Sequence, residues 1–260
     1  MRTPGMSRHD PLWLRVRSVA SVVVVLAAWE AVARAGLVPP LFLPAFSTVV
    51  VTLWGVIRDG SLPEDLAISL GRAAGGLTLA TLAGVLVGIA MARNRVAHWL
   101  LDPFVALGFP SPKIAFLPIF ILWFGIGSLS KILLVGFACV FPVAIGTYAA
   151  ARGINRVLIW SGRSLGASAG VLLGRVVLPA CAPRIFAAMR VALPVALITT
   201  FTAEMVGGGG GMGATLMYSQ RFFESPVVFA YLLVMLAVGL VLDTTMRRLQ
   251  ARSPVLRGDA

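Results

Sequence analysis

The sequence predicts an all-α protein, a polytopic membrane bundle of six transmembrane helices. Hydrophobic residues make up 58% of the 260 residues and charged residues only 12%, whereas soluble domains are about 45–50% apolar and about 25% charged. The apolar residues gather in long runs, and short basic connectors separate these runs. Lipid must therefore cover much of the surface. The net charge of +12 is explained by basic loops on the inner side of a membrane, so we expect no nucleic-acid partner.

The first 65 residues divide into three segments. Residues 1–17 are polar and basic and are expected to form a cytoplasmic tail. Residues 18–36 are the first predicted span, although the basic flank, the apolar run and the triplet Ala33-Arg34-Ala35 also fit a cleaved signal peptide. In both cases residues 37–65 follow on the outer surface, with an amphipathic helix near Thr48–Ile57.

Residues 66–246 are the predicted membrane core and contain five further spans. These are expected at Leu66–Ala92, Trp99–Gly125, Ser130–Ala151, Arg184–Val206 and Pro226–Met246. The first of them is rich in glycine, which lets helices approach closely in lipid. The next contains Pro110 and Pro112, so it must be kinked or broken.

The run Gly207–Gly211 separates the last two spans, and no helix would carry it. It is either slack chain or a close-packed turn at the outer mouth. Residues 247–260 form the predicted C-terminal tail. Most basic residues fall on the side of the two termini and of the connector 152–183, which places both termini in the cytoplasm.

The connector 152–183 lacks acidic residues and is long for a bundle with short loops. Its pattern predicts two short helices around a turn. The first covers about residues 155–165, and Gly166 supplies a left-handed break. Ser168 is positioned to cap the second helix, which Pro179 is expected to end. Such a basic, amphipathic elbow suits docking into a cytoplasmic partner.

Part of this connector resembles the cytoplasmic "EAA" signature of ABC importer permeases. The matching residues are Arg163-Ser-Leu-Gly166-Ala-Ser168, followed by Val176 and by Leu178-Pro179 at the expected distance. The Glu-Ala-Ala triplet itself is replaced by Trp160-Ser161-Gly162. Further segments are similar to the nitrate/sulfonate/taurine subgroup: Ser69-Leu-x-Arg72 with Gly76, Pro112-Lys-Ile-Ala115 with Trp123-Phe-Gly-Ile-Gly127, and Ala203-Glu-Met205 with Gly211-Met-Gly213.

The resemblance implies a type I ABC importer permease with a MetI-like fold in the bacterial inner membrane. It implies a non-catalytic subunit that binds no cofactor, while partner ATPase subunits use ATP and Mg. The implied partners are two ATPase subunits, an extracytoplasmic binding protein and a second permease, a homodimer being expected and a heterodimer left open. The implied substrate is a small solute: a sulfonate, taurine, nitrate, an aromatic acid or a pyrimidine vitamin precursor. The implied ATPase-coupling residues are Arg163, Leu165, Gly166, Ala167, Ser168, Val176, Leu178 and Pro179.

Three ionisable residues lie within the predicted spans and are candidates for the translocation pathway. Arg72 and Glu204 both fall near the outer end, where a structural ion pair is the simplest explanation. Lys113 lies deeper, beside the prolines. It is expected either to contact an anionic substrate or to bind carbonyls freed by the break.

Two other classes of membrane protein fit the sequence less well. A secondary transporter would show internal repeats and carboxylates at the midplane, whereas Glu30, Asp102, Glu204 and Asp243 all lie near span ends. A membrane-embedded enzyme would need a cluster of His, Ser or Asp, which we do not find. No phosphate-binding loop is present, and neither a disulfide nor a metal site is expected from two cysteines and two histidines.

Overall fold

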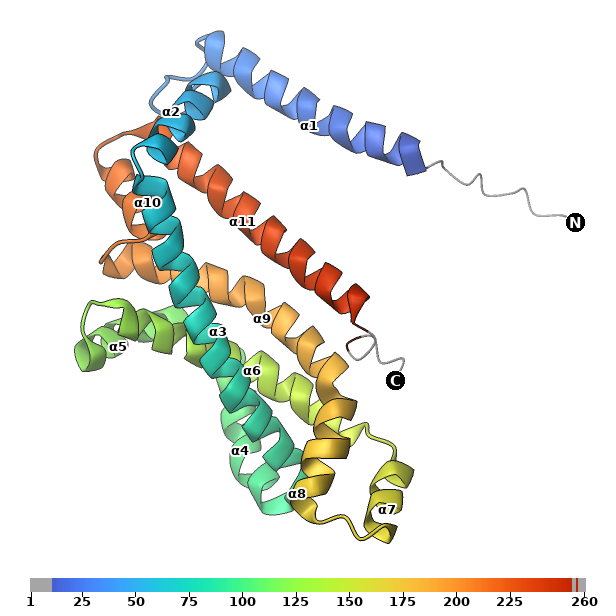
Figure 1. Cartoon of the computed structure of the whole chain (residues 1–260). Helices are drawn as coiled ribbons and strands as arrows, with labels where there is room; N and C mark the ends of the chain where they lie inside the picture. The colour runs from blue at the N-terminus through green and yellow to red at the C-terminus, as the bar shows by residue number, and fades with distance from the viewer. Residues whose placement is uncertain (1–10, 254–255, 257–260) are drawn as a thin grey trace, which may run out of the picture.

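The computed structural model describes residues 11–253 and 256 and shows an elongated bundle of helices (Figure 1). The residues 1–10 of the predicted N-terminal tail, and most of residues 253–260 of the C-terminal tail, lie outside this description. The helices are α1 (Pro11–Arg34), α2 (Phe46–Arg58), α3 (Ser61–Arg93), α4 (Arg95–Gly108), the 3-10 helix η1 (Lys113–Phe116), α5 (Leu117–Phe124), α6 (Ser128–Arg152), α7 (Arg156–Ser164), α8 (Ala169–Leu172), the π-helix η2 (Leu173–Val177), α9 (Leu178–Gly207), α10 (Met212–Arg221) and α11 (Ser225–Arg252).

Four helices in the described part of the chain are long and apolar enough to cross a membrane. They are α3, α6, the continuous helix Ala169–Gly207 and α11. A fifth span results if α4 and the segment η1–α5, which meet at 99°, are counted as one broken helix. The predicted six spans are therefore not confirmed. The remaining predicted span, residues 18–36, falls in α1, which is not among the counted helices.

The core of the bundle is the contact between α3 and α6. Gly76, Gly84 and Gly88 of α3 face α6 so closely that an added Cβ would lie 2.5–2.8 Å from its atoms. Close approach of this kind lets helices pack well in lipid, where exclusion of water cannot drive association. The partners of Gly76 and Gly84 are Val135 and Val143, so α3 and α6 run in the same direction.

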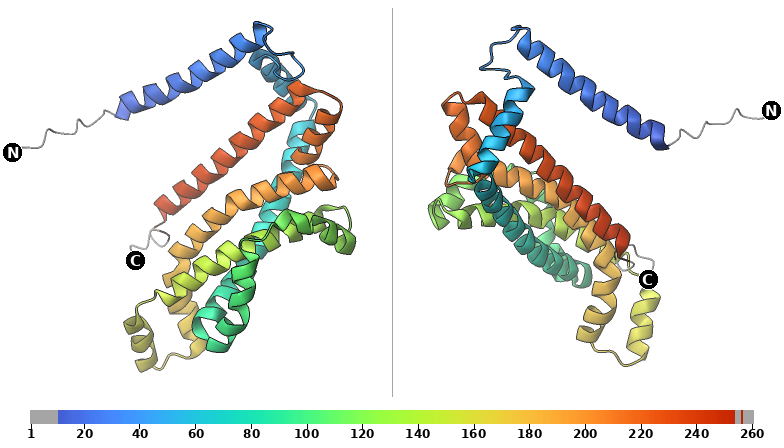
Figure 2. Two further views of the ribbon diagram at one scale, coloured as in Figure 1. Left: turned by 180° about the vertical axis from the view of Figure 1, so that it is seen from behind. Right: turned by 45° about the horizontal axis from the view of Figure 1, so that its top comes forward.

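Helix α9 packs on α6 in the opposite direction. Gly146 lies against Ala188, and the Cys139 thiol donates to the carbonyl of Ala192. Helix α11 runs back along α9, and Arg190 Nε contacts Asp243 Oδ1 at 3.0 Å. The bundle thus has two ends. We call them the connector end, where α7 and α8 lie, and the Arg72 end, where α10 lies (Figures 1 and 2).

The span expected at Trp99–Gly125 is broken, as its prolines predict. Helix α4 begins beside α6 near the connector end, with His98 stacked on Tyr148 at 5.1 Å. It ends at Gly108, and the chain turns by 99° before α5 continues toward the Arg72 end. Because a proline supplies no N–H and disfavours helix in the residue before it, Pro110 and Pro112 account for the break.

The amphipathic helix expected near Thr48–Ile57 is present as α2, and α1 is tied to its start. Trp29 Nε1 donates to the carbonyl of Pro44, and the Glu30 carboxylate accepts from both the N–H and the hydroxyl of Ser47. The side of α1 around Val22–Val25 is exposed, as expected of a helix whose neighbour is lipid or another chain.

One predicted boundary is wrong. Pro179 does not end the second elbow helix, because α8, η2 and α9 form one helix from Ala169 to Gly207. The reason is the π-turn before the proline, in which the N–H of Leu178 bonds to the carbonyl of Leu173, five residues back. Pro179 then lies in the first turn of α9, where a proline is tolerated.

Candidate functional site

The elbow at the connector end is built by two capped helix starts around one left-handed residue. The side chain of Asn155 accepts from the N–H of Val157 and begins α7. The predicted left-handed conformation of Gly166 is confirmed, with φ +77°. The predicted cap is also confirmed, because the Ser168 hydroxyl accepts from the N–H of Val171 at 3.4 Å.

The elbow has a buried side and an exposed apolar side. Gly162 packs against Leu172 so tightly that a Cβ would lie 2.5 Å from its methyl carbon, which holds α7 against the helix that follows. Four apolar side chains of the elbow are nevertheless at least half exposed: Val157, Leu158, Trp160 and Leu165, the last of them 87% exposed. An exposed apolar surface of this kind is typical of a site that contacts a partner protein or the membrane surface.

The other predicted coupling residues are spread along the same segment. Arg163 is exposed and Ala167 half-buried in the turn, while Val176 lies half-buried in η2. Leu178 and Pro179 are exposed at the start of α9. The structure therefore places these residues at one end of the molecule, and their contact with an ATPase stays a prediction.

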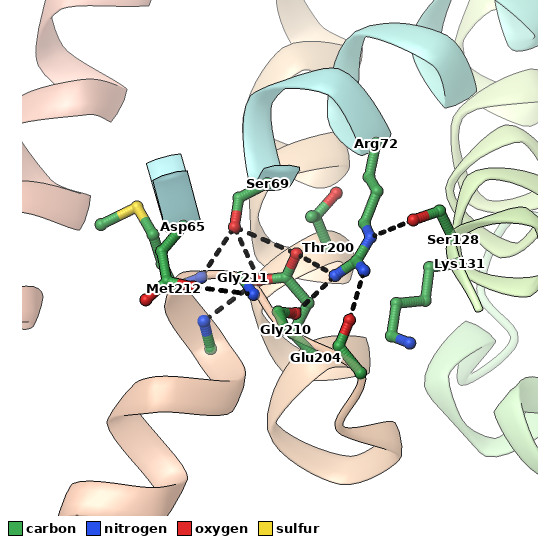
Figure 3. Close-up of polar contacts among 12 residues, drawn as sticks. Asp65, Ser69, Arg72, Ser128, Lys131, Thr200, Glu204, Gly210, Gly211 and Met212 are labelled. Atoms are coloured by element: carbon green, nitrogen blue, oxygen red, sulfur yellow. Dashed lines mark hydrogen bonds and ion pairs between the residues drawn. The ribbon is translucent and has the colours of Figure 1, made fainter. Parts of the chain in front are cut away.

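Arg72 and Glu204 form a buried ion pair at the Arg72 end (Figure 3). Arg72 Nη1 lies 2.8 Å from Glu204 Oε1, with side chains 3% and 0% exposed. The Glu204 carboxylate also accepts from the hydroxyl of Ser69 and from the N–H of Gly213. This many donors are needed because a carboxylate removed from water is stable only when its oxygens are satisfied.

The glycine run is a close-packed turn rather than slack chain. Gly208 to Gly211 all have positive φ, and Arg72 donates to the carbonyls of Gly209 and Gly210, both at 2.7 Å. A Cβ on Gly211 would lie 2.4 Å from Glu204 Oε1. Glycine is thus required both for the backbone conformation and for the space beside the carboxylate.

Asp65, a half-buried residue that sequence reasoning does not single out, makes a second set of polar contacts. Its carboxylate accepts from the N–H of Gly211, from Thr215 Oγ1 at 2.6 Å and from Tyr231 Oη at 2.9 Å. Asp65 and Glu204 therefore bind the N–H groups of Gly211 and Gly213 at the start of α10, where negative charge is favoured. The sequence signal was weak because Asp65 lies at the expected edge of a span.

Lys131 is a further buried charge at the Arg72 end. Its side chain is 0% exposed. Its ammonium donates to the carbonyls of Ile126 and Gly127, and in the described residues it has no carboxylate within 4 Å. It lies near the ion pair (Figure 3). A long flexible side chain can fold back to bond carbonyls freed at the start of its own helix, which sequence spacing does not reveal.

Lys113 lies apart from this cluster. It sits at the break after α4, where its ammonium donates to the carbonyl of Phe109 and lies 5.6 Å and 5.8 Å from the rings of Phe109 and Phe141. This is the arrangement expected of a lysine that satisfies carbonyls freed by the break. The three predicted pathway residues are thus not brought together, since only Arg72 and Glu204 meet.

The long apolar helices and the broken span are those of a polytopic helical membrane protein. Residues 80–253 match the family described as "Binding-protein-dependent transport system inner membrane component", and the chain belongs to this family. It is therefore the permease of a binding-protein-dependent ABC importer, a non-catalytic membrane subunit that works with an ATPase and a binding protein.

Named relatives agree with this family. The chain is 35% identical over 247 residues to the "Taurine transport system permease protein TauC" of Escherichia coli K12, covering 93% of this chain and 90% of the relative. It is 32% identical over 251 residues to the "Putative aliphatic sulfonates transport permease protein SsuC" of Bacillus subtilis 168, covering 96% and 90%.

Solved structures support the fold. An inward-facing structure of the MetNI methionine ABC transporter matches with a TM-score of 0.60 at 18% identity, covering 76% of this chain and 95% of the other. An amino acid ABC transporter crystallised with histidines matches with a TM-score of 0.59 at 16% identity, covering 76% and 94%. The expected MetI-like bundle is thus confirmed.

Proposed function

We propose that two copies of this chain, two ATPase subunits and an extracytoplasmic binding protein import a small sulfonate such as taurine. The names of the relatives TauC and SsuC support the substrate class. The basic connectors support the orientation, with both termini and the connector 152–183 in the cytoplasm. The ATPase subunits use ATP and Mg, and this chain binds neither.

The elbow is the observation that carries this proposal. One chain presents one exposed apolar elbow, so a dimeric ATPase with two equivalent grooves calls for two copies of the chain, and closed two-fold symmetry is the commonest way to pair identical subunits. Leu165 has the largest exposed fraction among the large hydrophobic residues of the elbow. Burial of exposed apolar surface of this kind is a main driving force of protein–protein association.

In this proposal Arg72 and Glu204 stabilise the part of the protein that lines the pathway. They do not contact the solute themselves. Their polar atoms are occupied by one another and by the glycine turn. Lys113 has a half-exposed side chain. In this proposal its ammonium stays hydrogen-bonded to the carbonyl of Phe109.

The experiment is co-purification followed by transport. The permease is co-expressed with its cognate ATPase, and the stoichiometry is measured by native mass spectrometry. We expect two copies of each chain, and ATP-driven uptake of radiolabelled taurine by proteoliposomes when the binding protein is present. Uptake driven by an ion gradient without ATP contradicts the proposal, as does a complex with a different second permease.

Leu165→Asp tests the docking surface. A carboxylate in an apolar groove is costly to desolvate, so the ATPase should be lost during purification while the membrane level of the permease is unchanged. Arg156→Gln is the matched control, because Arg156 is an exposed residue in the first turn of the same elbow. Equal ATPase retention by the two variants contradicts docking through this surface.

A further inference from the structure

A cavity of about 530 Å³ opens beside the glycine turn at the Arg72 end. Its volume is within the range of small-molecule sites, about 300–1,000 Å³. We call it the glycine-turn cavity. Its lining residues are Glu204, Met205, Val206, Gly207, Gly208, Gly210, Ala214, Thr215, Met217, Tyr218 and Arg221.

The turn directs backbone donors away from the ion pair. Arg72 binds the carbonyls of Gly209 and Gly210, and in a planar trans peptide the next N–H points opposite to the carbonyl. The N–H of Gly211, which follows the second of these carbonyls, binds the Asp65 carboxylate, so this face of the turn already holds one anion. The N–H of Gly210, which follows the first of these carbonyls, has no acceptor in the described part of the chain. Gly210 is exposed and lines the cavity.

The charges around the cavity favour an anion. Arg221 is exposed and, in the described residues, forms no ion pair. Lys131 is buried under the turn, and a Cβ on Gly209 would lie 3.3 Å from its ammonium. The Glu204 carboxylate reaches the lining, but its charge is balanced by Arg72. The Asp65 carboxylate, which accepts from the lining residue Thr215, offsets one of these two cations. The three cations Arg72, Lys131 and Arg221 thus outnumber the two carboxylates, those of Glu204 and Asp65, and leave one net positive charge beside an exposed backbone donor.

We propose that the glycine-turn cavity is a subsite for the anionic group of the transported solute, a sulfonate or a carboxylate. The N–H of Gly210 and the guanidinium of Arg221 are the donors, and the buried Lys131 adds positive potential. Oriented backbone amides and nearby cations form anion sites in this way. The inference rests on the proposed function, in which this end faces the binding protein.

The test compares two probes of nearly the same shape. Binding of methanesulfonate, an anion, and of dimethyl sulfone, which is neutral, is measured by saturation-transfer NMR with the permease–ATPase complex in nanodiscs. We expect saturation transfer to methanesulfonate, and displacement of it by taurine but not by dimethyl sulfone. Equal binding of the two probes overturns the subsite.

Variants locate the binding. Arg221→Gln removes the charge and leaves a shorter polar side chain, and it should weaken methanesulfonate binding about tenfold, as expected for loss of one charged hydrogen bond. Arg221→Lys should recover part of the affinity. The control is Arg58→Gln, which removes an exposed arginine in the last turn of α2, outside the cavity.

The outcomes separate the two proposals. Equal weakening by Arg221→Gln and Arg58→Gln would show only a general effect of surface charge and would overturn the subsite. ATPase retention and taurine uptake measure the proposed function and do not depend on the NMR signal. A complex that transports taurine but shows no difference between the probes therefore contradicts the subsite alone.

Discussion

At the scale of single residues, the Arg72 end depends on glycines that fit around one carboxylate. Gly208 has φ +61° and ψ −150°, and Gly211 has φ +96° and ψ +168°. Both conformations are nearly exclusive to glycine. The two glycines differ in their surroundings. Nothing lies within 4 Å of a Cβ on Gly208, whereas a Cβ on Gly211 would overlap the Glu204 carboxylate.

This difference gives a matched pair of substitutions. Gly208→Ala should lower the free energy of unfolding by about 1–3 kcal/mol through backbone strain alone. Gly211→Ala should cost more, because the methyl group also displaces Glu204 from Arg72, and a broken buried ion pair costs about 3–5 kcal/mol. Thermal unfolding of the purified permease measures both. Equal destabilisation would show that the carboxylate is not held at the position seen here.

At the scale of elements, the helix from Ala169 to Gly207 joins the elbow to the glycine turn. Its first residues belong to the second arm of the elbow, and its last turn carries Glu204. The π-turn in η2 keeps this helix continuous past Pro179. The angle of the elbow is therefore set by the short turn around Gly166, and not by a break before α9.

The elbow turn can be tested with two glycines that differ in backbone conformation. Neither Gly166 nor Gly170 has an atom within 4 Å of an added Cβ, but only Gly166 has positive φ. Gly166→Ala should cost about 1–2 kcal/mol locally and shift α7 against α8. Co-purification of the ATPase and solute uptake should therefore fall, while the amount of permease in the membrane stays the same. Gly170→Ala should leave both near wild type, since alanine favours helix.

Two results with these variants would contradict this explanation of the elbow. If Gly166→Ala retains ATPase and transports at the wild-type rate, the angle of the elbow does not matter for coupling. If Gly170→Ala is as damaging as Gly166→Ala, the loss comes from the contact surface and not from the backbone conformation.

At the scale of the whole molecule, the directions of the helices place the elbow and the ion pair at opposite ends. Helices α3 and α6 run in one direction and α9 in the other, so α7 and α8 lie far from α10 (Figure 1). Packing shows only that these two ends are opposite. With the elbow in the cytoplasm, as we propose from the basic connectors, the glycine turn and its cavity face outward.

Cysteine labelling tests this orientation. Arg156 in the elbow and Glu64 in the first turn of α3 are both exposed, and the native cysteines Cys139 and Cys181 are buried, so the parent protein is the unlabelled control. An impermeant maleimide added to intact cells should label Glu64→Cys, and Arg156→Cys should react only after permeabilisation. The reverse pattern would place the elbow outside and end the ABC docking proposal.

The membrane class, the helical fold, the family and the elbow were accessible from the sequence. Hydrophobicity and basic connectors act through the solvent and not through distant contacts, so long apolar runs indicate spans without a structure. The turn at Gly166, the cap at Ser168 and the break at Pro110 and Pro112 are local, because each depends on the backbone preferences of a few adjacent residues.

The buried polar site was decided by tertiary structure. Asp65 and Lys131 are distant in sequence from the glycine turn, and nothing in their neighbouring residues shows that both lie beside it or that Lys131 is buried. The continuation of the helix through Pro179 likewise depends on a π-turn that sequence preferences do not reveal. The partners of a buried charge are chosen by how α3, α6 and α9 pack, and only the folded chain brings those helices together.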